Sequence, residues 1–169
     1  DKKNGMDQEG KEMARGAYNL ADVIHRQNGD LKKAEELGRE CLRIGILAYG
    51  SSHNEVGLGY NLLARILKAQ GNFGDETRGL YERFLALSLR NEGPEGVNTA
   101  TGHYNVGFFC LELAQKQSTV DSKRTQLQLA KSHFFEAQRV FSKAYGPTDP
   151  HTVEASFCLT NILNYLSQT

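Results

Sequence analysis

Residues 49–73 read YGSSHNEVGLGYNLLARILKAQGNF, and this stretch decides the fold. Its string YNL at residues 60–62 has two close copies, YNL at residues 18–20 and YNV at residues 104–106. The tyrosines that open these strings stand 42 and 44 residues apart. Internal repetition with a period of this length is typical of solenoids, which are built from stacked helix pairs. The sequence therefore predicts an α-solenoid.

Each half of the repeat has the pattern of a helix. Between residues 58 and 69, apolar side chains recur every three or four positions, and no part of the chain shows a sustained alternation of apolar and polar residues. Gly29 and Gly71 each follow the repeat tyrosine by eleven residues, where a glycine is typical of a helix end. We predict an all-α fold of antiparallel helix pairs with seven helices, over residues 10–27, 31–48, 54–70, 74–91, 96–116, 124–144 and 151–167.

These helices are expected to form a single repeat domain over residues 1–169. The predicted repeats cover roughly residues 10–50, 54–93 and 96–146, and the terminal helix 151–167 brings the total to about three and a half repeats. The third repeat is too long for the period, and its extra length falls at residues 116–124, which are rich in Gln, Ser, Thr and Asp. Either a loop is inserted there or one helix is extended, and we expect a solvent-exposed loop.

Composition and charge exclude several classes of protein. Hydrophobic residues make up 39% of the 169 residues and charged residues 24%, as in folded soluble domains. The net charge is zero, so we expect neither a nucleic-acid nor a membrane partner, and no apolar run is long enough to cross a bilayer. The N-terminus has no signal peptide and no initiator Met, so we expect a processed or excised piece of a longer protein. Three cysteines, odd in number and far apart, indicate the cytoplasm or another reducing intracellular compartment.

No set of residues predicts catalysis, a metal site or a cofactor site. Residues 5–11 imitate a phosphate-binding loop, but Glu12 stands where that loop needs Ser or Thr, and no strand precedes it. The five histidines lack the spacing of a zinc site, and His53 and His151 are each expected to cap a helix or to bond a backbone carbonyl instead. Cys110 and Cys158 lie among apolar residues, where a thiol packs rather than reacts. We therefore expect a non-enzymatic protein without a cofactor.

Residues 49–73 resemble a tetratricopeptide repeat (TPR) of the kinesin-light-chain type. They contain a Gly followed three residues later by His53, an Asn-Leu-Ala core in the first helix, and Gln-Gly-x-aromatic at the turn. Residues 145–153 repeat the linker with one extra residue, and the resemblance covers residues 10–167. It is weakest in the third copy, where Gln115 replaces the turn glycine. The resemblance implies a right-handed superhelix whose first helices line a concave groove for peptides.

An asparagine recurs at one position of the first helix in several repeats, although Asn is a poor residue for the middle of a helix. Its amide both donates and accepts hydrogen bonds, which suits a groove for an extended peptide. Alternatively, the asparagines bond across neighbouring helices as spacers. We favour the groove, on the polar face of the first helices. Its expected residues are Arg15, Asn19, Arg26, Asn61, Arg65, Lys68, Thr101, Asn105, Glu112 and Asn161.

The sequence thus favours an interaction module whose groove, basic in its first half and acidic in its second, holds a peptide or helix of another protein. Two alternatives remain open: a structural stacking subunit of a larger assembly, and the repeat region of a longer multidomain protein whose catalytic domain lies elsewhere. The terminal helix either caps the solenoid or docks a partner, so the chain is either a monomer or an assembly subunit. Its packing stripe is expected to be Leu159, Ile162, Leu163 and Leu166.

Overall fold

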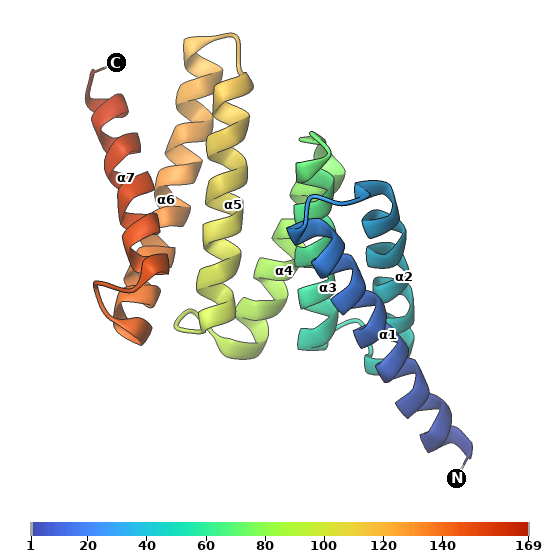
Figure 1. Cartoon of the computed structure of the whole chain (residues 1–169). Helices are drawn as coiled ribbons and strands as arrows, with labels where there is room; N and C mark the ends of the chain where they lie inside the picture. Colours follow the sequence, from blue (N-terminus) through green and yellow to red (C-terminus); the bar gives the residue numbers. More distant parts are fainter. Residues whose placement is uncertain (1, 169) are drawn as a thin grey trace. The chain divides into compact units, whose positions relative to one another are not determined.

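The computed structural model of the chain describes residues 2–168, with side chains from residue 8 onward. Every regular element in this part is an α-helix, which confirms the predicted all-α fold (Figure 1). None of these helices is both long and apolar enough to cross a bilayer. The seven helices are α1 (Lys2–Arg26), α2 (Leu31–Tyr49), α3 (Asn54–Ala69), α4 (Asp75–Glu92), α5 (Val97–Lys116), α6 (Val120–Tyr145) and α7 (Pro150–Gln168).

Five helices match their predicted bounds to within one residue, and the two exceptions are α1 and α6. α1 begins at Lys2 instead of residue 10, and α6 begins at Val120 instead of residue 124. The predicted loop over residues 116–124 is therefore wrong, because residues 117–119 alone connect α5 to α6. The cause is Thr119, whose backbone is extended and whose Oγ1 accepts a hydrogen bond from the Ser122 amide at 3.2 Å. The extra length of the third repeat is an extended helix.

Left-handed residues end α1 and α3, but they are different residue types. Gly71 follows α3 with φ of +82°, and the next amide, that of Asn72, donates to the Leu67 carbonyl at 3.0 Å. After α1 the left-handed residue is Asn28, with φ of +50°, and the amide of Gly29 donates to the Ile24 carbonyl at 2.9 Å. Both ends are Schellman motifs, in which the left-handed residue releases the chain from the helix. The predicted helix end near Gly29 is correct, but Asn28 is the residue that makes it.

The chain divides into two compact units, Asp1–Leu87 and Ser88–Thr169. In the first unit, Leu62 and Ile66 of α3 are fully buried against Ala21 of α1 and Ala34 of α2. The two alanines leave room for the branched side chains, so the α1–α2 pair and α3 share one apolar core. The single repeat domain over residues 1–169 remains a prediction.

The second unit contains α5, α6 and α7. α5 and α6 run side by side in opposite directions (Figure 1) and share a core around Ala100, Ala137 and Phe141. They approach closely at Gly107, where an added Cβ would lie 3.3 Å from the Cβ of His133 and 3.3 Å from a ring carbon of Phe134. Glycine at this position lets the two helices pack without displacing the buried Phe134 ring.

α7 packs on this pair through a face that differs from the predicted one. Its buried residues are Thr152, Ala155, Cys158 and Ile162. Of the predicted stripe only Ile162 is buried, whereas Leu163 is 43% exposed. Three of the four buried side chains are small, so α7 lies close to its neighbours through them, whereas the larger Val153, Phe157 and Leu163 are exposed.

Candidate functional site

A groove of about 460 Å³ runs between α5 and α7 in the second unit, and the first turns of α6 contribute to it. We call it the α5–α7 groove. Its lining residues are Phe108, Leu111, Ala114, Gln115, Lys123, Leu127, Glu154, Phe157, Cys158, Asn161, Ile162 and Tyr165. Because α5 and α7 are both first helices of their repeats, the groove lies on the kind of surface for which the sequence predicts a binding site.

The walls of the α5–α7 groove are mostly apolar and carry several aromatic rings. Phe108 stands 5.8 Å from Tyr104 and 6.4 Å from Phe134, measured between ring centroids, so its ring is held by two others. On the facing helix, Phe157 is 66% exposed. It is exposed because Cys158 and Ile162 define the buried face of α7 and leave Phe157 on another side of the helix.

Two charged side chains mark the groove. The Glu154 carboxylate accepts a hydrogen bond from the Tyr104 hydroxyl, and burial together with this bond raises the pKa of Tyr104. The Lys123 ammonium lies 4.6 Å from the centroid of the Tyr165 ring, a cation–π contact. Between these two charges, burial raises the pKa of the Cys158 thiol, which stays protonated and apolar in character at neutral pH.

Several predicted groove residues of the first unit meet between α1 and α3. Arg26 Nε lies 2.8 Å from one oxygen of Asp22, and Arg65 Nη1 lies 3.5 Å from the other. Burial and the Arg65 charge lower the pKa of His25, with a smaller contribution from the nearby Lys68. We call this group the α1–α3 cluster; two arginines contact a single carboxylate in it.

Arg15 and Asn19 lie apart from that cluster, in a cavity of about 200 Å³ among α1, α2 and α3. The cavity has an apolar floor that includes Cys41 and Val56, and Glu55 stands on its rim. Oppositely charged side chains therefore line the same small space.

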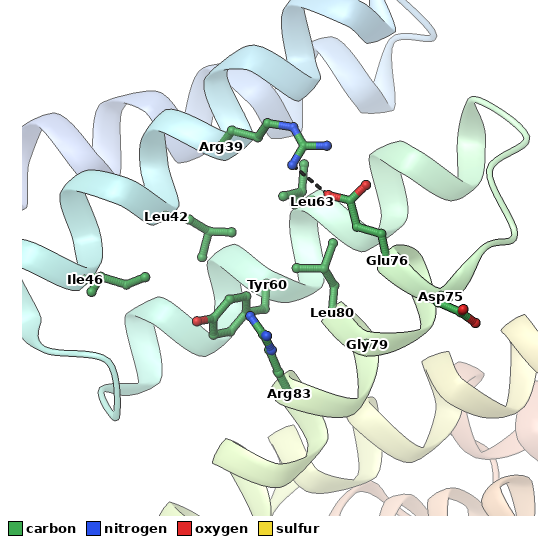
Figure 2. Close-up of a pocket in the computed structure, with 10 residues that line it drawn as sticks. All are labelled: Arg39, Leu42, Ile46, Tyr60, Leu63, Asp75, Glu76, Gly79, Leu80 and Arg83. Carbon is green, nitrogen blue, oxygen red and sulfur yellow. Dashed lines mark hydrogen bonds and ion pairs between the residues drawn. The ribbon is translucent and has the colours of Figure 1, made fainter.

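The first unit has a second hollow, of about 490 Å³, among α2, α3 and α4 (Figure 2). Arg39 Nη1 bridges to Glu76 Oε1 at 2.8 Å across it, and Arg83 lies 5.7 Å from the Tyr60 ring centroid. The Arg39 guanidinium also forms an ion pair with the Glu35 carboxylate. Arg39 and Glu76 therefore already have ion-pair partners within the unit. Figure 2 shows Leu42, Leu63 and Leu80 between these polar groups.

The ten predicted groove residues therefore fall into separate environments. Asn161 lines the α5–α7 groove, whereas Thr101 uses its hydroxyl to donate to the Val97 carbonyl within α5. Asn61 is only 8% exposed, Asn105 and Glu112 are half-buried, and these three are absent from the lining of the groove. Sequence reasoning missed Lys123, Phe157 and Tyr165 as groove residues.

The described residues also contain chemistry that the sequence did not single out. Among them, no three His, Cys, Asp or Glu side chains are grouped to hold a metal ion. His103 and His133 meet between α5 and α6, with their Nδ1 atoms 2.9 Å apart. Burial lowers the pKa of both, that of His133 to about 4, so the pair is neutral at pH 7. The predicted cap is confirmed at His53, whose Nδ1 accepts from the Glu55 amide at 3.2 Å. At His151 the ring instead pairs with a side chain, because its Nδ1 lies 3.0 Å from Asp149 Oδ1.

The sequence matches no protein-family model, and it has no significant match among curated proteins. Solved structures do match. TPR-like repeats of a kinesin light chain from Podosopora anserina superpose with a TM-score of 0.77 at 18% identity, over 94% of this chain and 69% of that one. A point variant of these repeats gives a TM-score of 0.55 at 17% identity, over 94% and 88% of the two chains. BtubC (BKLC) from P. vanneervenii gives 0.57 at 18% identity, over 92% and 63%. The helix pairs of this chain therefore have the fold of kinesin-light-chain TPR-like repeats.

Proposed function

We propose that the chain is a non-enzymatic interaction module that holds a peptide or helix of a partner protein in the α5–α7 groove. The observation that carries the proposal is the exposed ring of Phe157 on the wall of an apolar groove. Exposed apolar surface in a concave site is costly in water, and buried aromatic anchors supply much of the binding energy at protein interfaces. A partner side chain placed against Phe157 and Phe108 would remove both rings from water.

The α1–α3 cluster supports a separate contact within the first unit, with carboxylates of a partner. Arg26 and Arg65 outnumber the single carboxylate of Asp22, so an acidic segment would meet a positive surface there. Arg15 and Asn19 would flank that segment from their own cavity. Thr101, Asn105 and Glu112 remain predicted contacts of the second unit outside the groove.

The proposal includes no catalytic step, and it places the chain in the cytoplasm or another reducing compartment. All three cysteines are buried, and none of them forms a disulfide. Burial raises the pKa of Cys41 to about 11 and also raises that of Cys158, so neither thiol supplies a nucleophilic thiolate at neutral pH. Free thiols are the form that a reducing compartment maintains.

Selection from a display library of random peptides tests the proposal. Enriched peptides should bind the unaltered chain and the Phe135→Ala variant alike, because Phe135 is 52% exposed on α6 but does not line the groove. The Phe157→Ala variant should bind them more weakly, by roughly tenfold. An absence of enriched peptides, or equal binding by both variants, would remove the groove from the proposal.

A second candidate function, a stacking subunit of a larger assembly, is favoured by the outer face of α1. Met13, Leu20 and Val23 are each about half exposed on that face. Light scattering over a wide concentration range tests self-stacking. An oligomer that Leu20→Asp dissolves but Leu47→Asp preserves would support it, since Leu47 is 74% exposed on α2 away from that face. A monomer at every concentration would exclude it.

A further inference from the structure

The α5–α7 groove carries opposite charges at its two ends. Glu154, in the second turn of α7, accepts a hydrogen bond from the Tyr104 hydroxyl. The Lys123 ammonium lies over the Tyr165 ring near the other end of α7. Eleven residues separate Glu154 from Tyr165, so the two charged ends stand about 16 Å apart at the helical rise. A ligand that complements both ends of the groove must therefore carry opposite charges at its own two ends.

Between its charged ends the groove offers little hydrogen bonding. Its only amide side chains are those of Gln115 and Asn161, and most of its other lining residues are apolar. An extended peptide about 16 Å long has several backbone amides and carbonyls, and each needs a partner when it leaves water. An α-helix satisfies these groups internally and presents only side chains to the groove. The chemistry of the walls thus favours a helix over an extended strand.

Charge then selects the orientation of that helix. Acidic residues are favourable in the first turn of a helix and basic residues in the last turn. A helix with this pattern matches the groove when its N-terminus lies near Lys123 and its C-terminus lies near Glu154. In this orientation it runs antiparallel to α7, because Glu154 lies in the N-terminal part of α7 and Tyr165 in the C-terminal part.

Resting on the proposed function, we propose that the occupant of the α5–α7 groove is an amphipathic helix of about three turns that runs antiparallel to α7. Its apolar side chains, spaced i, i+3 or i+4, and i+7, face Phe108 and Phe157. An Asp or Glu in its first turn meets Lys123, and a Lys or Arg in its last turn meets Glu154.

Three synthetic peptides of equal composition, added to the full chain in calorimetric titrations, test this assignment. The first has the apolar stripe with acidic residues first and basic residues last. The second exchanges the two charged ends, and the third keeps the charges of the first but has proline in the middle of the stripe, where it breaks the helix. Each peptide carries one proline, at its first position in the first two peptides. The first peptide should bind about tenfold more tightly than either of the others.

Charge variants of the chain test whether Lys123 determines the affinity of the first peptide. Lys123→Glu should weaken the first peptide several-fold, whereas Arg124→Glu, the same charge change at an exposed neighbour that does not line the groove, should leave its affinity unchanged. Circular dichroism of each variant verifies that the helices remain intact.

The outcomes separate this inference from the proposed function. Equal binding of the proline peptide would overturn the helix, and equal binding of the charge-exchanged peptide would overturn its orientation, while both would leave the groove as a binding site. If none of the three peptides binds, but peptides from the library bind the unaltered chain and bind the Phe157→Ala variant more weakly, the helical occupant is wrong and the proposed function stands. If the library also yields nothing, both fail.

Discussion

Leu20 and Leu62 hold the same place in successive repeats but differ in what covers them. Each is the third residue of a YNL string, yet Leu62 is fully buried and Leu20 is 48% exposed. Leu62→Ala should therefore lower the free energy of unfolding by about 3 kcal/mol or more, since Ala21 and Ala34 beside it are too small to fill the space. Leu20→Ala removes a half-exposed side chain and leaves no closed cavity, so it should cost about 1 kcal/mol.

Urea unfolding followed by the helical circular dichroism signal measures both substitutions. Both lie in the first unit, so they act on the same transition even if the two units unfold separately. A difference of about 2 kcal/mol corresponds to roughly 1 M urea between the two midpoints. Equal shifts of the two urea midpoints would refute the argument that burial of the leucine, and not its position in the repeat, determines the loss of unfolding free energy. A Leu20→Ala shift that grows with protein concentration would show that a second copy covers this face.

Three further predictions concern packing, pH and thiol reactivity. Gly107→Ala should lower the melting temperature, because the new methyl group meets the buried Phe134 ring and this overpacking outweighs the better helix propensity of Ala. An unchanged or raised melting temperature would contradict the close approach of α5 and α6. Stability should fall as the pH drops from about 6.5 toward 4, since unfolded histidine takes up a proton near its ordinary pKa of 6.5 whereas folded His133, with a pKa of about 4, does not. Melting temperatures at pH 7 and pH 5 should therefore differ less for His133→Gln, and an equal difference would count against the neutral pair with His103. Ellman's reagent should react slowly with the three buried cysteines of the native chain and rapidly in urea, and fast native labelling would contradict their burial.

The helices that the sequence predicted well are those whose limits are encoded locally. α2 and α3 begin next to Asp30 and His53, side chains that accept hydrogen bonds from the first amides, and such capping residues are visible in the sequence. The start of α6 was predicted less well. The prediction gave more weight to the polar composition of residues 116–124 than to the capping residue Thr119. Exposed polar residues in the first turns of α6 are compatible with a helix that has solvent on that side.

The groove was harder to predict because its residues come together only through tertiary packing. Lys123 and Tyr165 stand on different helices, and no local pattern indicates that they meet. The buried face of α7 was mispredicted for a related reason: Thr152, Ala155 and Cys158 are small, and a pattern search weighted toward large apolar residues selects Leu163 instead. In contrast, the approach of Arg26 and Arg65 to the α1–α3 cluster follows from equivalent faces of successive first helices.

The Schellman motif at the end of α1 also bears on the chemical ageing of the protein. Asn-Gly pairs lose ammonia when the glycine nitrogen attacks the asparagine Cγ and closes a succinimide ring, which later opens to Asp or isoaspartate. In this chain the nitrogen that would attack belongs to Gly29, and its hydrogen is bound to the Ile24 carbonyl at 2.9 Å. The ring can close only after that bond breaks, so the rate of deamidation at Asn28 reports how often the last turn of α1 opens.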